Sequence, residues 1–162
     1  MWVLAGAPWG QARRRHDLVL DWFTCRIQPL AQTALGDDIY DLAQAREDKA
    51  QGELLVSLLA PESGWEAYAA EMAGTVVGFV AIQLNHDTQV GEIGLNAVHP
   101  DHAGTGVGTA MYDFAIARMQ EAGMRVATVT TGGDPSHAPA RRAYEKAGFT
   151  VQIPSVWLYR KL

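Results

Sequence analysis

Three glycines stand at alternate positions, Gly104, Gly106 and Gly108, between a strand-like and a helix-like stretch of the sequence. Glycine has no Cβ, so the backbone of such a loop can approach a ligand closely. The loop and the first turn of the helix can aim several N–H groups at one point, next to the positive end of the helix dipole. This pattern predicts an anion site, and phosphate is its usual occupant.

Two nucleotide-binding loops fit the sequence poorly. A Walker A loop reads G-x-x-x-x-G-K-S/T, and no lysine follows Gly108. The dinucleotide fingerprint reads G-x-G-x-x-G and opens a βαβ unit, whereas the glycines here are spaced G-x-G-x-G and follow a predicted meander. The pattern therefore favours another class of phosphate site.

A second candidate for chemistry is Tyr144, in the stretch HAPARRAYEKAG. Helical spacing places it on one face with Ala140, Ala143 and Ala147, and these small side chains leave room beside its ring. A phenol has a reference pKa of about 10, so it stays protonated at pH 7 and can act as a proton donor. A core tyrosine that packs on the sheet is the alternative interpretation.

Glu92 is the main candidate for a general base. Strict strand alternation over GEIGLNAVHP places Glu92, Gly94 and Asn96 on one face, unless a bulge interrupts the strand. A carboxylate beside two small or polar side chains could face a cleft, and a solvent-facing glutamate fits the pattern equally well. Weaker candidates for a base, at expected loops or strand ends, are His86, Asp87 and His99.

The elements that must position these residues begin with a change of hydrophobic period after Pro61. Before it, the chain reads as mostly helical, with a first strand at either Trp2–Gly6, which we favour, or Trp22–Ile27. After it, the sequence predicts a hairpin that turns at Ala73–Gly74. The later expected elements are a strand over 90–100, a helix over 107–123, a buried strand over 125–131, a helix over 137–148 and closing strands over 149–153 and 156–162.

This order predicts one domain over residues 1–162 of the layered α/β (α+β) class. We expect a mixed, mostly antiparallel central sheet of about six or seven strands, flanked by about four helices. The length fits one domain, and the hydrophobic share of 48% is enough to bury a core.

Two motifs in order carry a resemblance to a known family. The stretch AVHPDHAGTGVGTAM is similar to an acyl-CoA loop, Q/R-x-x-G-x-G/A, that follows a strand ending near V-x-P. The stretch HAPARRAYEKAGF is similar to N-x-x-A-x-x-x-Y-x-x-x-G-F, one strand further on. Over roughly residues 65–162 the chain resembles the GNAT N-acetyltransferase superfamily. The resemblance implies the GNAT acyltransferase fold, acetyl-CoA as cosubstrate, and direct acetyl transfer to a primary amine of a small molecule, peptide or protein.

The resemblance also implies roles for individual residues. Tyr144 matches the usual general acid, and Glu92 has the spacing of a base that acts through water in the histone-acetylating branch. A backbone N–H near Val98 would stabilise the oxyanion, and the pantetheine arm would pair with Ala97 and Val98. The residues implied in cofactor binding are Ala97, Val98, Ala103, Gly104, Thr105, Gly106, Val107, Gly108, Thr109, His137 and Tyr144.

The chain departs from the family pattern at three of these positions. Ala103 stands where the family has Gln or Arg, Thr105 where it often has Lys, and His137 where it has Asn. Backbone donors must then bind the pyrophosphate, with Arg141 and Arg142 as candidates for the missing charge. The departures leave open a non-catalytic acyl-CoA-binding sensor or partner module, and the retained tyrosine argues against it. A longer acyl donor is also open.

The composition limits which classes of binding partner and which cellular settings are expected. The formal net charge is −5 and no long basic block occurs, so nucleic acid is not expected. No apolar stretch is long enough for a membrane span, and the N-terminus does not resemble a secretory signal. Cys25 is the only cysteine, which fits a reducing, cytoplasmic setting. No metal is expected, because Pro100 and a turn separate His99 from His102 and no further ligand joins them. A homodimer is common in the resembled family.

Overall fold

The computed structural model describes residues 2–5, 35–44, 50, 53–55, 57–58, 60 and 62–161. Within them, a five-stranded sheet has its strands in chain order, β1-β2-β3-β4-β5. The first four strands are antiparallel neighbours, and β5 runs parallel to β4, so the sheet is mixed as predicted. The strands are β1 (Trp2–Ala5), β2 (Trp65–Met72), β3 (Thr75–Asn85), β4 (Val90–Val98) and β5 (Val126–Val129).

The favoured position of the first strand is confirmed, since Trp2–Ala5 pairs antiparallel with β2. The alternative, Trp22–Ile27, lies outside the described residues. The predicted hairpin is confirmed as well. Ala73 and Gly74 join β2 to β3 with φ values of 51° and 80°. Two successive positive φ values match the twist of a tight hairpin, and a glycine adopts one of them without strain.

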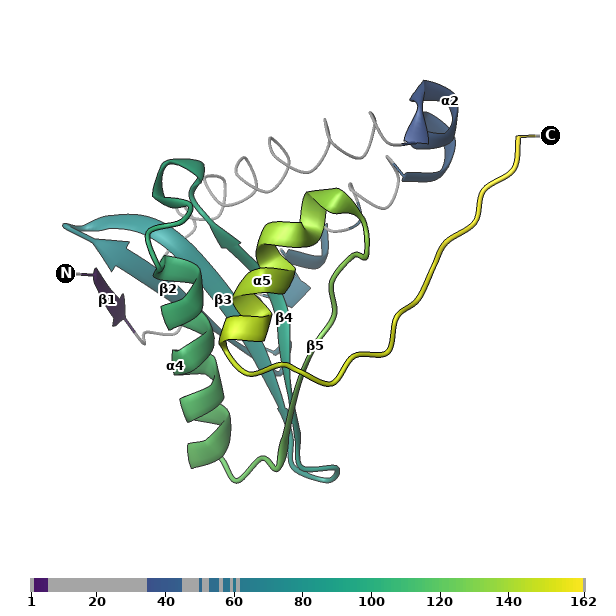
Figure 1. The fold of residues 1–162 in the computed structure, drawn as a ribbon. Helices are drawn as coiled ribbons and strands as arrows, with labels where there is room; N and C mark the ends of the chain where they lie inside the picture. The colour runs from purple at the N-terminus through teal and green to yellow at the C-terminus, as the bar shows by residue number, and fades with distance from the viewer. Residues whose placement is uncertain are drawn as a thin grey trace.

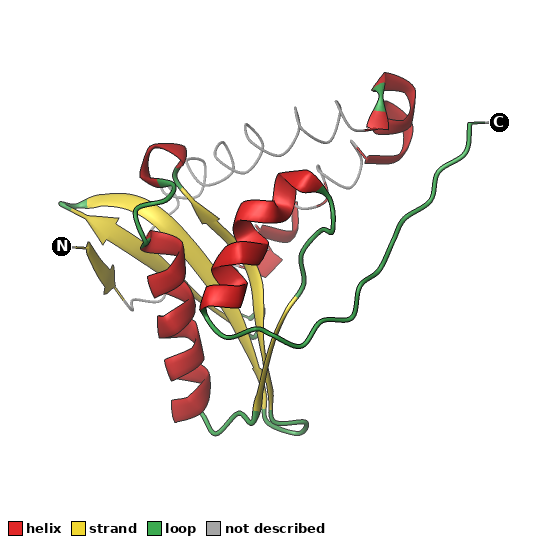
Figure 2. Ribbon diagram, viewed as in Figure 1, coloured by secondary structure: helices red, strands yellow, loops and turns green. Residues whose placement is uncertain are grey.

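Two helices, α4 (Val107–Glu121) and α5 (Ala138–Lys146), lie on one face of the sheet (Figures 1 and 2). Helix α4 packs on β3 and β4, and α5 contacts α4. No helix in the described part of the chain is both long and apolar enough to cross a membrane. The shorter helical elements are α2 (Asp37–Ile39), the π-helical turn Tyr40–Gln44 and the 3-10 turns Pro100–His102 and Pro135–His137.

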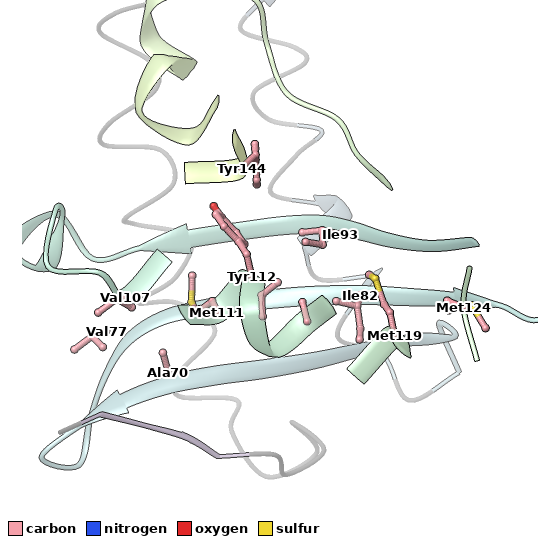
Figure 3. Close-up of a cluster of buried hydrophobic side chains, with 12 residues drawn as sticks. Ala70, Val77, Ile82, Ile93, Val107, Met111, Tyr112, Met119, Met124 and Tyr144 are labelled. Atoms are coloured by element: carbon pink, nitrogen blue, oxygen red, sulfur yellow. The ribbon is translucent and has the colours of Figure 1, made fainter. Parts of the chain in front are cut away.

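The main hydrophobic cluster lies between α4 and the sheet. Met111 and Met119 of α4 belong to one buried cluster with Ile82 of β3 and Ile93 of β4 (Figure 3). The strand surface carries glycine where the helix comes closest: a Cβ added to Gly91 would stand 2.6 Å from Met119 Cγ. The buried residues of α4 recur at helical spacing and are Val107, Met111, Tyr112, Ala115 and Met119.

A β-bulge in β4 changes the predicted strand alternation. Val80 of β3 pairs with Asn96, but Ile82 pairs with Ile93, so β4 holds one extra residue between these pairs. The extra residue turns Ile93 and Asn96 toward the same face, the one that α4 covers. The expectation that Glu92 and Asn96 share a face is therefore wrong, because Glu92 pairs with Gln83 on the opposite face.

The C-terminal part also differs from the prediction. Strand β5 is an exposed edge strand rather than a buried one, and Val126 is 56% exposed. The closing strands expected over 149–153 and 156–162 do not form within the described residues 149–161, which run as an extended coil away from the sheet (Figure 2). Their alternating apolar side chains fit a strand only when a partner strand covers them, and here Val151 and Ile153 are 94% and 95% exposed. The described part of the chain thus accounts for five of the six or seven strands expected.

Candidate active site

The glycine loop ends at the first turn of α4 with unused backbone donors. Gly104 and Gly106 have φ values of 79° and 90°, which a residue with a Cβ rarely adopts. Gly106 is the N-cap and provides no side-chain cap. The first helical bond runs from the Ala110 N–H to the Gly106 carbonyl, at 3.1 Å. The N–H groups that precede it have no partner in the helix, and they belong to Val107, Gly108 and Thr109.

The two unusual loop residues serve the shape of the loop. The Thr105 hydroxyl donates to the His102 carbonyl at 2.7 Å, so this side chain is engaged within the turn. The Ala103 N–H donates to the Pro100 carbonyl at 3.1 Å. Neither residue adds a positive charge, so the electrostatic attraction of the loop for an anion comes from the backbone amides and the helix dipole.

The loop lies against the end of β4. A Cβ added to Gly108 would stand 3.5 Å from Val98 Cγ2, an ordinary contact distance. The neighbouring Val107 side chain is buried in the core and fixes the first turn of α4 over the sheet. The structure therefore brings together the predicted phosphate loop and Val98, which were expected to bind two parts of one ligand.

Strand β4 extends beyond its neighbour β5. Their parallel pairing ends at Ile93 and Val129, while β4 continues to Val98. On its other side, the His99 N–H donates to the Val77 carbonyl at 2.8 Å. Backbone groups alternate in direction along a strand. Because the His99 N–H points toward β3, the N–H and C=O of Val98 point toward the opposite edge, where β5 no longer pairs with β4. This edge can bind an extended ligand as a strand would.

Tyr144 lies on the same face of the sheet as α4. Its residue exposure is 6%, and its ring packs on Tyr112 with ring centroids 4.7 Å apart (Figure 3). Asn96 Nδ2 donates to the Tyr144 hydroxyl at 3.0 Å, and the Tyr112 hydroxyl donates to Asn96 Oδ1 at 2.9 Å. Burial, and next the neighbouring Tyr144, raise the pKa of Tyr112 well above that of an ordinary phenol. Tyr144 is thus a core residue whose hydroxyl belongs to a hydrogen-bond network.

Asn96 and Tyr112 are site residues that sequence reasoning missed. Asn96 was grouped with Glu92, because the bulge that turns it toward α4 depends on pairing with β3. The available signal was an amide side chain in a strand whose other residues, apart from Glu92, are apolar or glycine, because asparagine is depleted in strands. Tyr112 lies beside Met111 on the buried side of α4. A tyrosine at a buried helix position was the signal for this residue, since a buried phenol hydroxyl needs a hydrogen-bond partner.

Glu92 lies apart from this network. It pairs with Gln83 of β3 and Thr128 of β5, and it is partly exposed on the face opposite α4. The same face carries Trp65, whose ring covers the bulge: a Cβ added to Gly94 would stand 2.4 Å from Trp65 Cζ3. The structure therefore separates the two predicted catalytic side chains by the thickness of the sheet.

His137 is held within the loop that precedes α5. Its Nδ1 lies 2.6 Å from Asp134 Oδ2, and it occupies the N-cap position of α5 without a side-chain cap. Arg141 donates to the carbonyls of Gly132 and Asp134, at 2.7 Å for the second, so this guanidinium also braces the loop. Across the part of the chain that the structure describes, no three His, Cys, Asp or Glu side chains form a group that could hold a metal ion.

Comparison with known proteins identifies the family. The sequence model of the acetyltransferase (GNAT) family matches residues 28–149, about three quarters of the chain. The matched residues include strands β2 to β5, the glycine loop and helices α4 and α5. The chain belongs to the GNAT acetyltransferase family.

Two curated relatives share part of the sequence. The mycothiol acetyltransferase of Thermobispora bispora is 32% identical over 99 residues, which are 58% of this chain and 32% of the relative. The mycothiol acetyltransferase of Sanguibacter keddieii is 36% identical over 96 residues, which are 56% of this chain and 30% of the relative. The matched part of the chain spans about a third of the length of each relative.

Solved structures share the fold along most of the chain. The PaiA N-acetyltransferase of Thermoplasma acidophilum, in complex with coenzyme A, has a TM-score of 0.70 at 13% identity and covers 96% of this chain and 93% of that one. The IAA acetyltransferase of Bacillus cereus has a TM-score of 0.61 at 16% identity, with 94% and 79% covered. At such identities the likeness concerns the fold.

Proposed function

We propose that the chain is an acetyl-CoA-dependent N-acetyltransferase that transfers the acetyl group directly to a primary amine. One juxtaposition carries the proposal. The first turn of α4, with its free N–H groups, lies next to Val98. Val98 is in the part of β4 that extends beyond its pairing with β5. Asn96, two residues before Val98, donates a hydrogen bond to the Tyr144 hydroxyl. The anion site, the free strand edge and the Tyr144 hydroxyl thus lie along one short stretch of backbone.

The residues present fit coenzyme A. The N–H groups of Val107, Gly108 and Thr109 would bind the pyrophosphate. Apart from the chain neighbours, no atom of the described residues lies within 4 Å of a Cβ added at Gly104 or Gly106, so a phosphate can approach the loop backbone. Val98 would pair with the pantetheine arm. The fold neighbour from Thermoplasma acidophilum was solved with coenzyme A, which supports this assignment. Acetyl-CoA supplies the activated acetyl thioester.

The chain's own groups then divide the work of acyl transfer. The Val98 N–H stabilises the negative charge that develops on the thioester oxygen as the amine nitrogen attacks the acetyl carbon. Formation of the amide would break the C–S bond of the thioester, and the bonding electron pair would leave with sulfur. Tyr144 would donate its hydroxyl proton to the leaving sulfur. The acylated nitrogen would release its extra proton and the tyrosinate would regain one from solvent, so the protons balance.

Glu92 is the proposed base that removes a proton from the incoming ammonium, directly or through water. Glu92 lies on the face opposite α4, so in this proposal the amine would approach from the side of Glu92 and the thiol would leave on the side of Tyr144. The net charge of −5 favours a cationic acceptor. The relatives named mycothiol acetyltransferase support acetyl transfer, and the acceptor here is a small molecule, peptide or protein amine.

Calorimetric titration with acetyl-CoA tests the cofactor assignment, and absence of heat at millimolar cofactor would contradict it. Thiol release with spermidine, glucosamine and a lysine peptide then tests catalysis. Tyr144→Phe should lower kcat by at least about 100-fold while the Kd for acetyl-CoA stays within twofold. Binding without acetylation of any amine would favour a non-catalytic acyl-CoA-binding module.

A further inference from the structure

We propose that Asn96 is a positioning residue that keeps the Tyr144 hydroxyl oriented as a proton donor. The inference rests on the proposed function and adds a requirement to it. Asn96 lies in the bulged strand β4, and it reaches the hydroxyl of Tyr144 on α5 and that of Tyr112 on α4. Its side chain thus joins the sheet to both helices at the phenol that the reaction uses.

The orientation of the Asn96 amide follows from its neighbours. One terminal atom lies 3.1 Å from the Gly94 carbonyl oxygen, which can only accept hydrogen bonds, so this atom is the Nδ2 donor. The other, Oδ1, receives the hydrogen of the Tyr112 hydroxyl at 2.9 Å. Burial keeps Tyr112 protonated, because it raises the pKa of this phenol, so Tyr112 remains a donor.

Counting hydrogens then determines the role of Tyr144. Asn96 Nδ2 carries two hydrogens, one directed to the Gly94 carbonyl and the other to the Tyr144 oxygen at 3.0 Å. The Tyr144 oxygen is therefore an acceptor in this contact, and its own hydrogen must go elsewhere. The nearest recorded acceptor is Asn96 Oδ1 at 3.4 Å, a long contact to an atom that already binds Tyr112. The hydrogen of Tyr144 is consequently weakly held and available to a stronger acceptor such as a thiolate.

The bulge is what makes this arrangement fit. Without the extra residue in β4, Asn96 would project to the face of Glu92, away from both tyrosines. With it, the carbonyl of Gly94 and the amide of Asn96 come within hydrogen-bond reach of one another. The backbone distortion and the proton donor are therefore parts of one arrangement.

A first experiment measures the hydrogen bonds themselves. The chain has only two asparagines, and exposed Asn85 is a matched control for Asn96, so the side-chain amide resonances of ¹⁵N-labelled protein are simple to assign. The Asn96 Nδ2 hydrogens should exchange at least about tenfold more slowly than those of Asn85. Tyr144→Phe should shift the Asn96 resonances and leave those of Asn85 unchanged. Equal exchange rates for the two, or no shift, would overturn the proposal.

A second experiment measures the consequence for turnover with the best amine of the spermidine, glucosamine and lysine-peptide set. Asn96→Asp keeps the shape but replaces the donor by an acceptor, so kcat should fall about 10- to 100-fold with an unchanged KM for acetyl-CoA. In the Tyr144→Phe background the same substitution should cost less than about twofold. If Asn96→Asp lowered kcat equally in the natural sequence and in the Tyr144→Phe background, the proposed role of Asn96 would be overturned and that of Tyr144 would stand. Tyr144→Phe without effect would instead overturn the proposed role of Tyr144 and the inference with it.

Tyr112→Phe is a more conservative test if the carboxylate introduced by Asn96→Asp disturbs folding. It removes only the hydroxyl that orients Asn96 Oδ1 and keeps the ring that packs on Tyr144. We expect a loss of kcat of about threefold to tenfold that disappears in the Tyr144→Phe background. A loss that persists there, with the urea midpoint unchanged, would contradict the inference.

Discussion

Gly78 lies directly beneath Met111, so closely that a Cβ added to Gly78 would stand 2.8 Å from Met111 Sδ. The same Cβ would stand 3.1 Å from the Ala97 carbonyl oxygen, which belongs to the backbone of β4. The helix can therefore rest on β3 only because this position has no side chain. Its close approach places the first turn of α4 next to the end of β4, where the loop and Val98 meet.

The first prediction follows from that contact. Gly78→Ala should lower the free energy of unfolding by about 1–3 kcal/mol, because the methionine side chain can move but the Ala97 carbonyl cannot. Urea unfolding measures the change. Gly108→Ala is the control, since its added methyl makes only an ordinary contact with Val98 and alanine favours a helix. Equal destabilisation by the two substitutions would contradict the packing argument.

The second prediction concerns the left-handed N-cap of α4. Gly106→Ala places a Cβ on a residue with a φ of 90°, which should cost about 1–2 kcal/mol or force the loop to change shape. We expect the Kd for acetyl-CoA to rise at least tenfold by calorimetry. Gly106→Asn should retain more affinity, because asparagine tolerates positive φ better. Alanine binding as well as glycine would show that the loop conformation does not matter for the cofactor.

The third prediction is a pH dependence of stability. Burial raises the pKa of Tyr112, so the folded state keeps a proton that the unfolded state loses above about pH 10. The stability that Tyr112 contributes is complete below that pH and declines as the pH rises further, by at most about 1.4 kcal/mol per pH unit. Urea unfolding from pH 8 to 11 should show a shallower decline for Tyr112→Phe than for the natural sequence. Parallel curves would contradict the assignment.

The fourth prediction tests Glu92. Glu92→Gln should remove the acidic limb of the pH profile of kcat/KM, because that limb reports the base of the free enzyme. The Kd for acetyl-CoA should stay unchanged, since Glu92 lies on the face opposite Tyr144 and α4. Glu121→Gln, on the exposed end of α4, is the control and should leave the profile unaltered. A profile that Glu92→Gln leaves identical would assign the base to another group.

Local signals predicted most of the elements that build the site. The hairpin at Ala73–Gly74, the glycine loop, and both helix ends at Gly123 and Gly148 appear where short-range sequence rules place them. Each depends on backbone conformations of a few neighbouring residues, which the residue type restricts directly. The helix spacing that singled out Tyr144 is of the same local kind.

The parts that sequence reasoning missed depend on pairing between distant segments. The bulge at Gly94 is visible only once β3 and β4 are in register, and it decides which face Asn96 occupies. The exposure of β5 and the coil after Phe149 depend likewise on whether another strand lies beside them. Alternating apolar residues mark a segment that can pair, and they do not specify its partner.

Because the β4–β5 pairing ends early, backbone hydrogen exchange along β4 can report whether a ligand is bound there. Beyond Ile93, the backbone amides of β4 on the side of β5 are not paired with that strand. They should therefore exchange with deuterium faster than the amides between Val90 and Ile93 that pair with β5. A pantetheine arm that pairs with Val98 would slow that exchange at the residues it covers. Deuterium uptake would then map the bound cofactor along the strand before any acceptor amine has been found.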